Sequence, residues 1–211
     1  MDLEHRQQQV GRELLRHEVR TGLIRQLTGL TDHGIRGLYR SEAGEVPVRH
    51  RGKSPVQVTF LWKNEPLRED AAVFVCLWRR ESEVLRLEPA EQGLAGRLRV
   101  AEGFCDTYGL FRQFCPQSPL TLERAYSVVR ALKNQQGIRA EPCERCGALW
   151  LVDALAVKGE HCGHCKSAER QALEGESART RGRKARPRHL DGSPQQQSLF
   201  GAGAEGESPR L

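Results

Sequence analysis

Residues 1–40 carry apolar side chains at the three- and four-residue steps that line one face of a helix. The segment at 28–32 (TGLTD) interrupts this pattern and predicts a helix boundary there. Asp32 is expected to cap a second, shorter helix that carries Ile35, Leu38 and Tyr39. The apolar positions of the first helical stretch are Leu14, Leu15, Val19, Leu23, Ile24 and Leu27.

Three further helices are predicted beyond a loop at 43–56 (AGEVPVRHRGKSPV), which holds two Pro and two Gly. A third helix follows the breaker at 64–66, and a fourth covers 94–114. A fifth opens at Ser118, a cap followed by Pro119 in the first turn, and ends at Gly137. The predicted core positions of these helices are Ala71, Phe74, Val75, Trp78, Leu85, Leu94, Leu98, Ala101, Cys105, Tyr108, Phe111, Leu122, Ala125, Tyr126, Val129 and Leu132.

From Cys143 onward, paired cysteines surround a short β-prone stretch at 149–152. After Lys166 the chain is rich in Arg, Ser, Gly, Gln and Glu, and we expect it to be disordered because it is too polar to bury a core. The sequence therefore predicts a mainly α-helical protein in three parts. These are a helical body at 1–140, a small zinc-binding module at 141–167 and a disordered basic and polar tail at 168–211.

Composition limits the class of protein. Of 211 residues, 38% are hydrophobic and 28% are charged, which is typical of a soluble globular protein. The net charge of +6 is uneven, because residues 179–188 carry six basic groups and no acidic one. The charge therefore does not by itself indicate that the folded part binds nucleic acid.

The longest apolar run, 71–78, is far short of the roughly 20 residues that cross a bilayer. The N-terminus shows no secretory signal, so we expect a cytoplasmic protein with reduced thiols.

Four cysteines follow the spacing C-x2-C-x15-C-x2-C, and this pattern predicts a metal site. Two thiolates three residues apart can bind one metal from a single tight turn, and the intervening residues are enough for a hairpin that brings the second pair across from the first. Gly147 and Gly163 suit such turns, which often require positive φ. Four thiolates leave no open coordination position, so we expect one structural zinc ion. The predicted ligands are Cys143, Cys146, Cys162 and Cys165.

Other roles for these residues remain open at this stage. The four cysteines could be free core thiols or form two disulfides in an oxidising compartment, and His161 or His164 could replace one of them as a ligand. Cys76, Cys105 and Cys115 lie in or beside apolar helical stretches, where cysteine usually behaves as a small buried hydrophobe.

Residues 21–40 (TGLIRQLTGLTDHGIRGLYR) have the length and spacing of a helix-turn-helix, with Gly29 at the turn. Arginine on the second helix suits guanine edges and phosphates in the major groove. Arg25 departs from the motif, because a small residue normally stands there and lets the two helices approach. Two ordinary helices packed in a core explain the segment equally well. The expected interior positions are Ile24, Leu30, Ile35 and Leu38, and the expected outward ones are Asp32, His33, Arg36 and Arg40.

A compact basic patch follows in the predicted loop. Arg49, His50, Arg51 and Lys53 combine there on a flexible segment, which is the chemistry expected for phosphate contact. The alternative is a solvated surface loop. Together with Arg36 and Arg40 of the second helix, these four are the predicted DNA-binding residues.

Five segments occur in a distinctive order along the chain. They are TDHGIRGLYR, the basic loop with its prolines, VTFLWKNEPLREDAAVF, QFCPQSPLTLERAYSVVRAL and CERCG…CGHC. In that order, over residues 20–166, the chain resembles the FlhC subunit of the bacterial flagellar master activator. The cysteine pairs alone would not indicate a family, but a Cys-Pro step followed by the RAYSVVR helix and then by the cysteine site is distinctive.

The resemblance implies a mainly helical fold with a C-terminal zinc module held by the four cysteines given above. It also implies assembly with a small helical FlhD-like partner on double-stranded promoter DNA, and activation of transcription by RNA polymerase. Similar subunits are encoded by conjugative plasmids and integrative elements, where they switch on transfer genes. The resemblance therefore implies that the controlled genes are flagellar or conjugative-transfer genes.

The sequence has two rival interpretations, a clamp-tethered binding protein and an enzyme. The peptide at 196–200 (QQSLF) looks like the short motif by which bacterial replication and repair proteins attach to the sliding clamp, which would make the chain a zinc-containing nucleic-acid-binding protein without a regulatory role. An enzyme is not expected, because the chain has no phosphate-binding loop, no GxGxxG after a strand and no HExxH.

Overall fold

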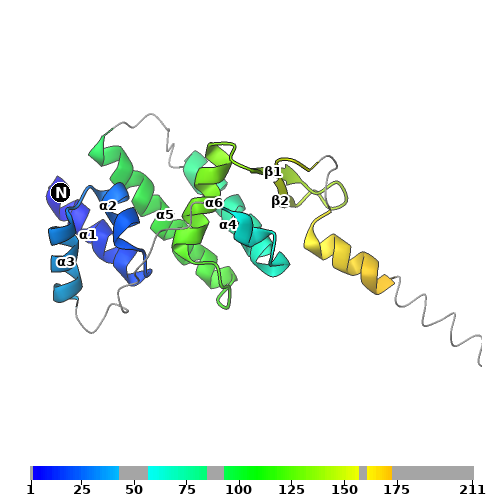
Figure 1. Ribbon diagram of the computed structural model, residues 1–211, viewed down its shortest axis with the longest axis horizontal. Helices are drawn as coiled ribbons and strands as arrows, with labels where there is room; N and C mark the ends of the chain where they lie inside the picture. The colour runs from blue at the N-terminus through cyan, green and yellow to red at the C-terminus, as the bar shows by residue number, and fades with distance from the viewer. Residues whose placement is uncertain (1, 43–56, 85–92, 157–160, 173–211) are drawn as a thin grey trace, which may run out of the picture. The chain divides into compact units, whose positions relative to one another are not determined.

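The computed structural model describes residues 2–42, 57–84, 93–156 and 161–172. The chain divides into one unit at Met1–Arg170 and a second at Gln171–Leu211, of which only residues 171 and 172 are described. The expected mainly helical fold, with four cysteines clustered in its C-terminal part, is confirmed (Figure 1). The elements are α1 (Leu3–Arg16), α2 (Thr21–Thr28), α3 (Asp32–Ser41), η1 (Thr59–Leu61), α4 (Glu65–Val84), α5 (Leu94–Phe114), α6 (Leu122–Lys133), β1 (Ile138–Pro142) and β2 (Leu149–Asp153).

Helices α1, α2 and α3 pack against one another in an N-terminal three-helix group (Figure 1). The turn between α1 and α2 contains Glu18 at φ 59. This left-handed backbone conformation separates the two helices, although the turn contains neither Gly nor Pro. Gly29 ends α2 at φ 73. The cap of α3 is Thr31 rather than Asp32, because the Thr31 side chain accepts a hydrogen bond from the Gly34 backbone N–H (3.1 Å). The buried core of the group comprises Val10, Leu14, Leu15, Val19, Leu23, Ile24, Leu27, Ile35 and Leu38.

Helices α4, α5 and α6 contact one another and form the second helical layer of the unit (Figure 1). The predicted bounds of α5 are confirmed. Its aromatic side chains pack against α4, where the ring centroid of Phe74 lies 5.1 Å from that of Phe104 and 5.7 Å from that of Phe111. Leu85, which was expected in the core of α4, lies outside the described residues.

Helix α6 begins at Leu122, and its cap lies three residues later than the expected cap at Ser118. Thr121 caps it instead, since its hydroxyl accepts a hydrogen bond from the Arg124 backbone N–H (3.3 Å). Ser118 is engaged elsewhere and donates its hydroxyl to Asp70 Oδ2 of α4 (2.5 Å).

Two ion pairs join the N-terminal group to the second helical layer. Arg6 Nε of α1 donates to Glu102 Oε1 of α5 (2.6 Å). Arg20, just before α2, pairs with Glu123 of α6, whose side chain is buried. These contacts add to the packing of α1 and α2 on α5.

Strands β1 and β2 form an antiparallel hairpin that follows α6. β1 begins at Ile138, within the stretch expected to be helical body, and contacts α6, whereas β2 contacts α4. A further helix covers 163–172, so residues 168–172, which were assigned to the tail, are helical. None of the helices described here is long and apolar enough to span a bilayer.

Candidate functional site

The four predicted cysteines converge on one point in the structure. Their sulfur atoms all lie within 4.8 Å of one another, and they could bind a metal ion. Cys143 and Cys146 occupy the turn of the hairpin, directly after β1, and Cys162 and Cys165 lie at the start of the helix at 163–172. The spacing therefore predicted the cluster correctly, although the 15-residue spacer contributes only β2 to the hairpin and β1 precedes the first cysteine.

The first pair lies in a tight, hydrogen-bonded turn. The Gly147 N–H donates to the Cys143 carbonyl (2.8 Å), and the Cys143 N–H donates to the Ala148 carbonyl (2.8 Å). Gly147 adopts φ 72, as expected, a conformation that L side chains rarely adopt. This turn places the Cys143 and Cys146 side chains on the same side of the hairpin.

Gly163 in the second pair has a different role from the one expected. It does not have positive φ, and a Cβ at this position would overlap the Glu69 carboxylate and lie 3.3 Å from Glu65 Cγ. Because α4 approaches the second cysteine pair closely, a larger residue at position 163 would force the Glu69 side chain to move. This approach packs the four-cysteine module against the helical body.

The surroundings of Cys143 and Cys165 shift the pKa values of these two thiols in opposite directions. The Cys162 backbone N–H donates to Cys143 Sγ (3.4 Å), and this contact, followed by that from the Cys146 N–H, lowers the pKa of Cys143 to about 6. Burial, reinforced by the neighbouring cysteines, raises the pKa of Cys165 to about 12. A divalent cation at the centre of the cluster stabilises all four thiolates and removes this conflict.

The geometry fits a tetrahedral metal ion. Sulfur ligands at about 2.3 Å from a tetrahedral ion are about 3.8 Å apart. Cys146 Sγ and Cys162 Sγ are 3.6 Å apart, and no pair exceeds 4.8 Å. Four sulfur donors around one point complete the coordination shell, so the arrangement can bind a metal but leaves no position for a substrate.

A buried arginine connects this module to α4. Arg68 is 8% exposed, and its guanidinium carbon lies 4.3 Å from the ring centroid of Trp150 on β2 and 5.5 Å from that of Trp62. Stacking on tryptophan stabilises a desolvated guanidinium by about 2 kcal/mol. Sequence reasoning missed this contact, because Arg68 has the spacing of an ordinary polar helix position and its partners are distant in the sequence.

The alternatives left open by the sequence can now be compared with the structure. All seven cysteines are described and free. His161 pairs with Glu169 (Nδ1 to Oε1, 3.4 Å) and His164 is exposed, so neither belongs to the cluster in the described residues.

The remaining cysteines lie apart from the cluster and differ in exposure. Cys105 is buried as predicted, Cys115 is half-buried, and the expectation that Cys76 is buried is wrong. Cys76 lies on the solvent-facing side of α4. The prediction was wrong because the residues next to it in sequence are apolar.

The second predicted site is the exposed face of α3. Ile24, Ile35 and Leu38 are buried and Leu30 is partly buried, as the motif requires, while Arg25 is 60% exposed and pairs with Asp32 (3.5 Å). Arg25 therefore does not separate the two helices.

Four residues of α3 line a surface hollow on this face: His33, Arg36, Tyr39 and Arg40. Arg36 Nε donates to the Asp32 carbonyl (3.2 Å), and Arg40 Nε donates to the Arg36 carbonyl (3.4 Å). Both bonds use Nε, so among the described residues the terminal nitrogens of these arginines have no hydrogen-bond partner. Guanidinium groups of this kind are suited to anionic oxygens and guanine edges.

Some predicted residues cannot be compared in this way. Arg49, His50, Arg51 and Lys53 of the basic loop lie outside the described residues, as does the peptide at 196–200.

The fold and the sites define a mainly helical protein with a helix-turn-helix-like segment and a four-cysteine cluster that could bind a metal ion. No protein-family model matches the chain, and no curated protein matches it either.

Proposed function

We propose that the protein is a DNA-binding transcriptional activator subunit of FlhC type. It acts with a small FlhD-like helical partner to recruit or stimulate RNA polymerase at flagellar or conjugative-transfer promoters. The observation that carries the proposal is the face of α3, where Arg36 and Arg40 stand exposed on the second helix of a helix-turn-helix-like segment.

The N-terminal three-helix group supports α3 as the element that enters the major groove. α1 contacts both α2 and α3. Packing against α1 therefore holds α3 in place, although α3 is short. Recognition helices of this kind contact base edges with residues near their N-terminus. His33 and Arg36 occupy that part of α3, and Arg40 lies one turn further along for phosphate contact. The basic loop with Arg49, His50, Arg51 and Lys53 supplies further phosphate contacts in the same proposal.

The metal in this proposal is one zinc ion with a structural role. Zinc favours four thiolates in a tetrahedral arrangement, and such a closed site has no open position for catalysis. The free energy of zinc binding stabilises the folded state of a two-stranded hairpin that is too small to fold by burial alone. Reduced thiols and a DNA target are both consistent with a cytoplasmic protein, and the proposal includes no enzymatic activity.

The test is a binding titration by fluorescence anisotropy at several salt concentrations. The chain, supplied with an FlhD-like partner, is titrated against a duplex enriched from a random-sequence library. Arg36→Ala/Arg40→Ala should weaken binding by about 10- to 100-fold, and loss of the Arg40 phosphate contact should reduce the magnitude of the salt slope by about 1.

Arg80→Ala/Arg139→Ala removes the same charge from exposed positions on α4 and β1, and should bind like the wild type. Equal weakening by the two double variants would show that the effect is one of net charge and would contradict the assignment of α3. No enrichment of any duplex would contradict the proposed function itself.

A further inference from the structure

A cavity of about 540 Å³ lies between α4, α5 and α6, away from the cysteine cluster and from α3. Its volume falls within the 300–1,000 Å³ typical of small-molecule sites. Walls from three different helices make it a hollow rather than a flat face. A half-open pocket of this size at the surface of one unit is suited to a small ligand.

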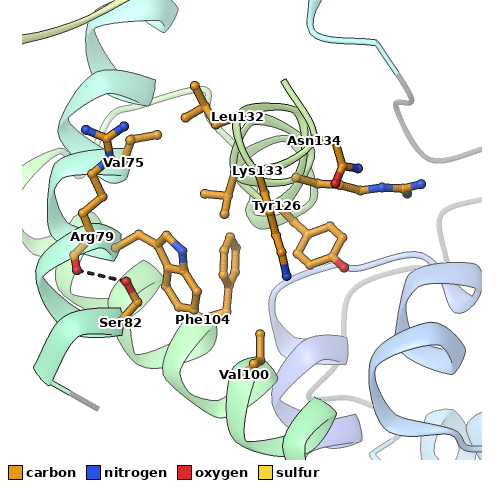
Figure 2. Close-up of a pocket in the computed structure, with 12 residues that line it drawn as sticks. Val75, Arg79, Ser82, Val100, Phe104, Tyr126, Leu132, Lys133 and Asn134 are labelled. Carbon is orange, nitrogen blue, oxygen red and sulfur yellow. Dashed lines mark hydrogen bonds between the residues drawn. The ribbon is translucent and has the colours of Figure 1, made fainter. Parts of the chain in front are cut away.

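The floor of the cavity is aromatic. The ring centroid of Phe104 lies 4.8 Å from that of Trp78 and 5.5 Å from that of Tyr126, so three rings from three helices form a continuous apolar surface. In Figure 2, Phe104 lies between Arg79 on one wall and Tyr126 on the other. Trp78 and Tyr126 are only partly buried, so their rings remain available to an occupant. This surface favours a flat or flexible hydrocarbon body.

The charged groups around the cavity are all positive. Arg79 of α4 and Arg130 and Lys133 of α6 line it, and among the described residues its lining includes no acidic one. Figure 2 labels Arg79 and Lys133. All three cations are exposed at the protein surface, and within the described part of the chain none of them forms an ion pair. Cations clustered around an apolar hollow attract a ligand with a negative group.

We propose that this cavity binds a small amphipathic organic anion, with its hydrocarbon body on the aromatic floor and its carboxylate at Arg130 and Lys133. Charge complementarity excludes a cationic occupant, and the apolar floor excludes a bare inorganic anion as the best ligand. The site also touches the helix-turn-helix-like segment, because Gln26 of α2 donates a 3.5 Å hydrogen bond to the Tyr126 hydroxyl.

Three probes of equal chain length separate the contributions of charge and hydrocarbon: decanoate, 1-decanol and decyltrimethylammonium. Each is titrated into the full chain by isothermal calorimetry, with the fluorescence of the tryptophans as a second signal. Decanoate should bind saturably with one site per chain, about tenfold more tightly than 1-decanol, and decyltrimethylammonium should bind more weakly than either. Equal affinities for decanoate and 1-decanol would overturn the proposal, as would the absence of saturation below about 1 mM.

Substitutions in the lining test whether the ligand binds in this cavity. Arg130→Ala/Lys133→Ala should lower the affinity for decanoate about tenfold and leave that for 1-decanol unchanged, because the two charges contribute only to the anion. Val129→Trp fills the hollow and should abolish binding of both. Arg80→Ala, one residue from Arg79 but outside the lining, is the matched control and should bind decanoate as the wild type does. Circular dichroism confirms that each variant is folded, and unchanged decanoate affinity in the folded Arg130→Ala/Lys133→Ala chain would exclude this site.

Discussion

The substitution Trp150→Ala tests how the metal-binding hairpin is held on the helical body. Trp150 is 2% exposed on β2, and its ring covers Arg68 of α4 at 4.3 Å. A tryptophan buries about 150–250 Å², which at about 25 cal/mol per Å² corresponds to about 4–6 kcal/mol as an upper estimate. Truncation of a buried Trp to Ala typically costs about 3–5 kcal/mol. We therefore expect the free energy of unfolding to fall by about 3–5 kcal/mol.

Urea denaturation gives the required measurement, with two signals recorded in parallel. Far-ultraviolet circular dichroism reports the helices, and a colorimetric chelator reports release of the metal. Because α4 packs directly on β2 within one unit, the two transitions should shift together. Leu155→Ala is the control, since Leu155 is 87% exposed on the same module and its truncation should cost less than about 0.5 kcal/mol.

Two results would refute this reasoning. One is a cost below about 1 kcal/mol for Trp150→Ala, which would mean that the buried ring contributes little. The other is a shift of metal release with no shift of the helical transition, which would mean that the hairpin and the helices unfold independently.

Three further predictions concern the cluster, the ion pair and pH. Cys143→Ala should lose the metal by elemental analysis, whereas Cys76→Ala, outside the cluster, should retain one ion per chain; a fully metallated Cys143→Ala chain would exclude the assignment. Glu123→Gln should lower the free energy of unfolding by about 2 kcal/mol in urea, because the buried carboxylate pairs with Arg20, and unchanged stability would refute this. Burial lowers the pKa of His17, so the stability it contributes is present above about pH 6.5 and is lost as the pH falls toward the lowered pKa. His17→Gln should flatten the dependence of stability on pH between about 7.5 and 5.5, and an unchanged slope would contradict this.

Local patterns predicted the features that depend on local chemistry. The bounds of α5 follow from its apolar period, and the cysteine cluster follows from two x2 spacings, each of which makes a metal-binding turn within a few residues. The positive φ of Gly147 likewise depends only on the turn that contains it. For these features the relevant interactions lie within one or two turns of chain, so the sequence carries the information directly.

Features that depend on packing were not predicted. β1 was missed because the segment IRAEP contains one β-branched residue and a proline, and it is a strand only because β2 pairs with it. The sequence predicts Ser118 as a cap, because its pairing with Asp70, 48 positions away, leaves no local pattern. Arg68 between two tryptophans and the cavity around Phe104 likewise arise from contacts between separate helices and strands.

Photocrosslinking from α3 to bound DNA tests the central claim most directly. p-Benzoylphenylalanine is introduced at His33, on the exposed face of α3, or at Phe114, which is 67% exposed at the end of α5. Each chain is irradiated in complex with the enriched duplex and the FlhD-like partner. The account predicts a covalent DNA adduct from position 33 and none from position 114. Bound complexes that yield an adduct from position 114 but none from position 33 would contradict it.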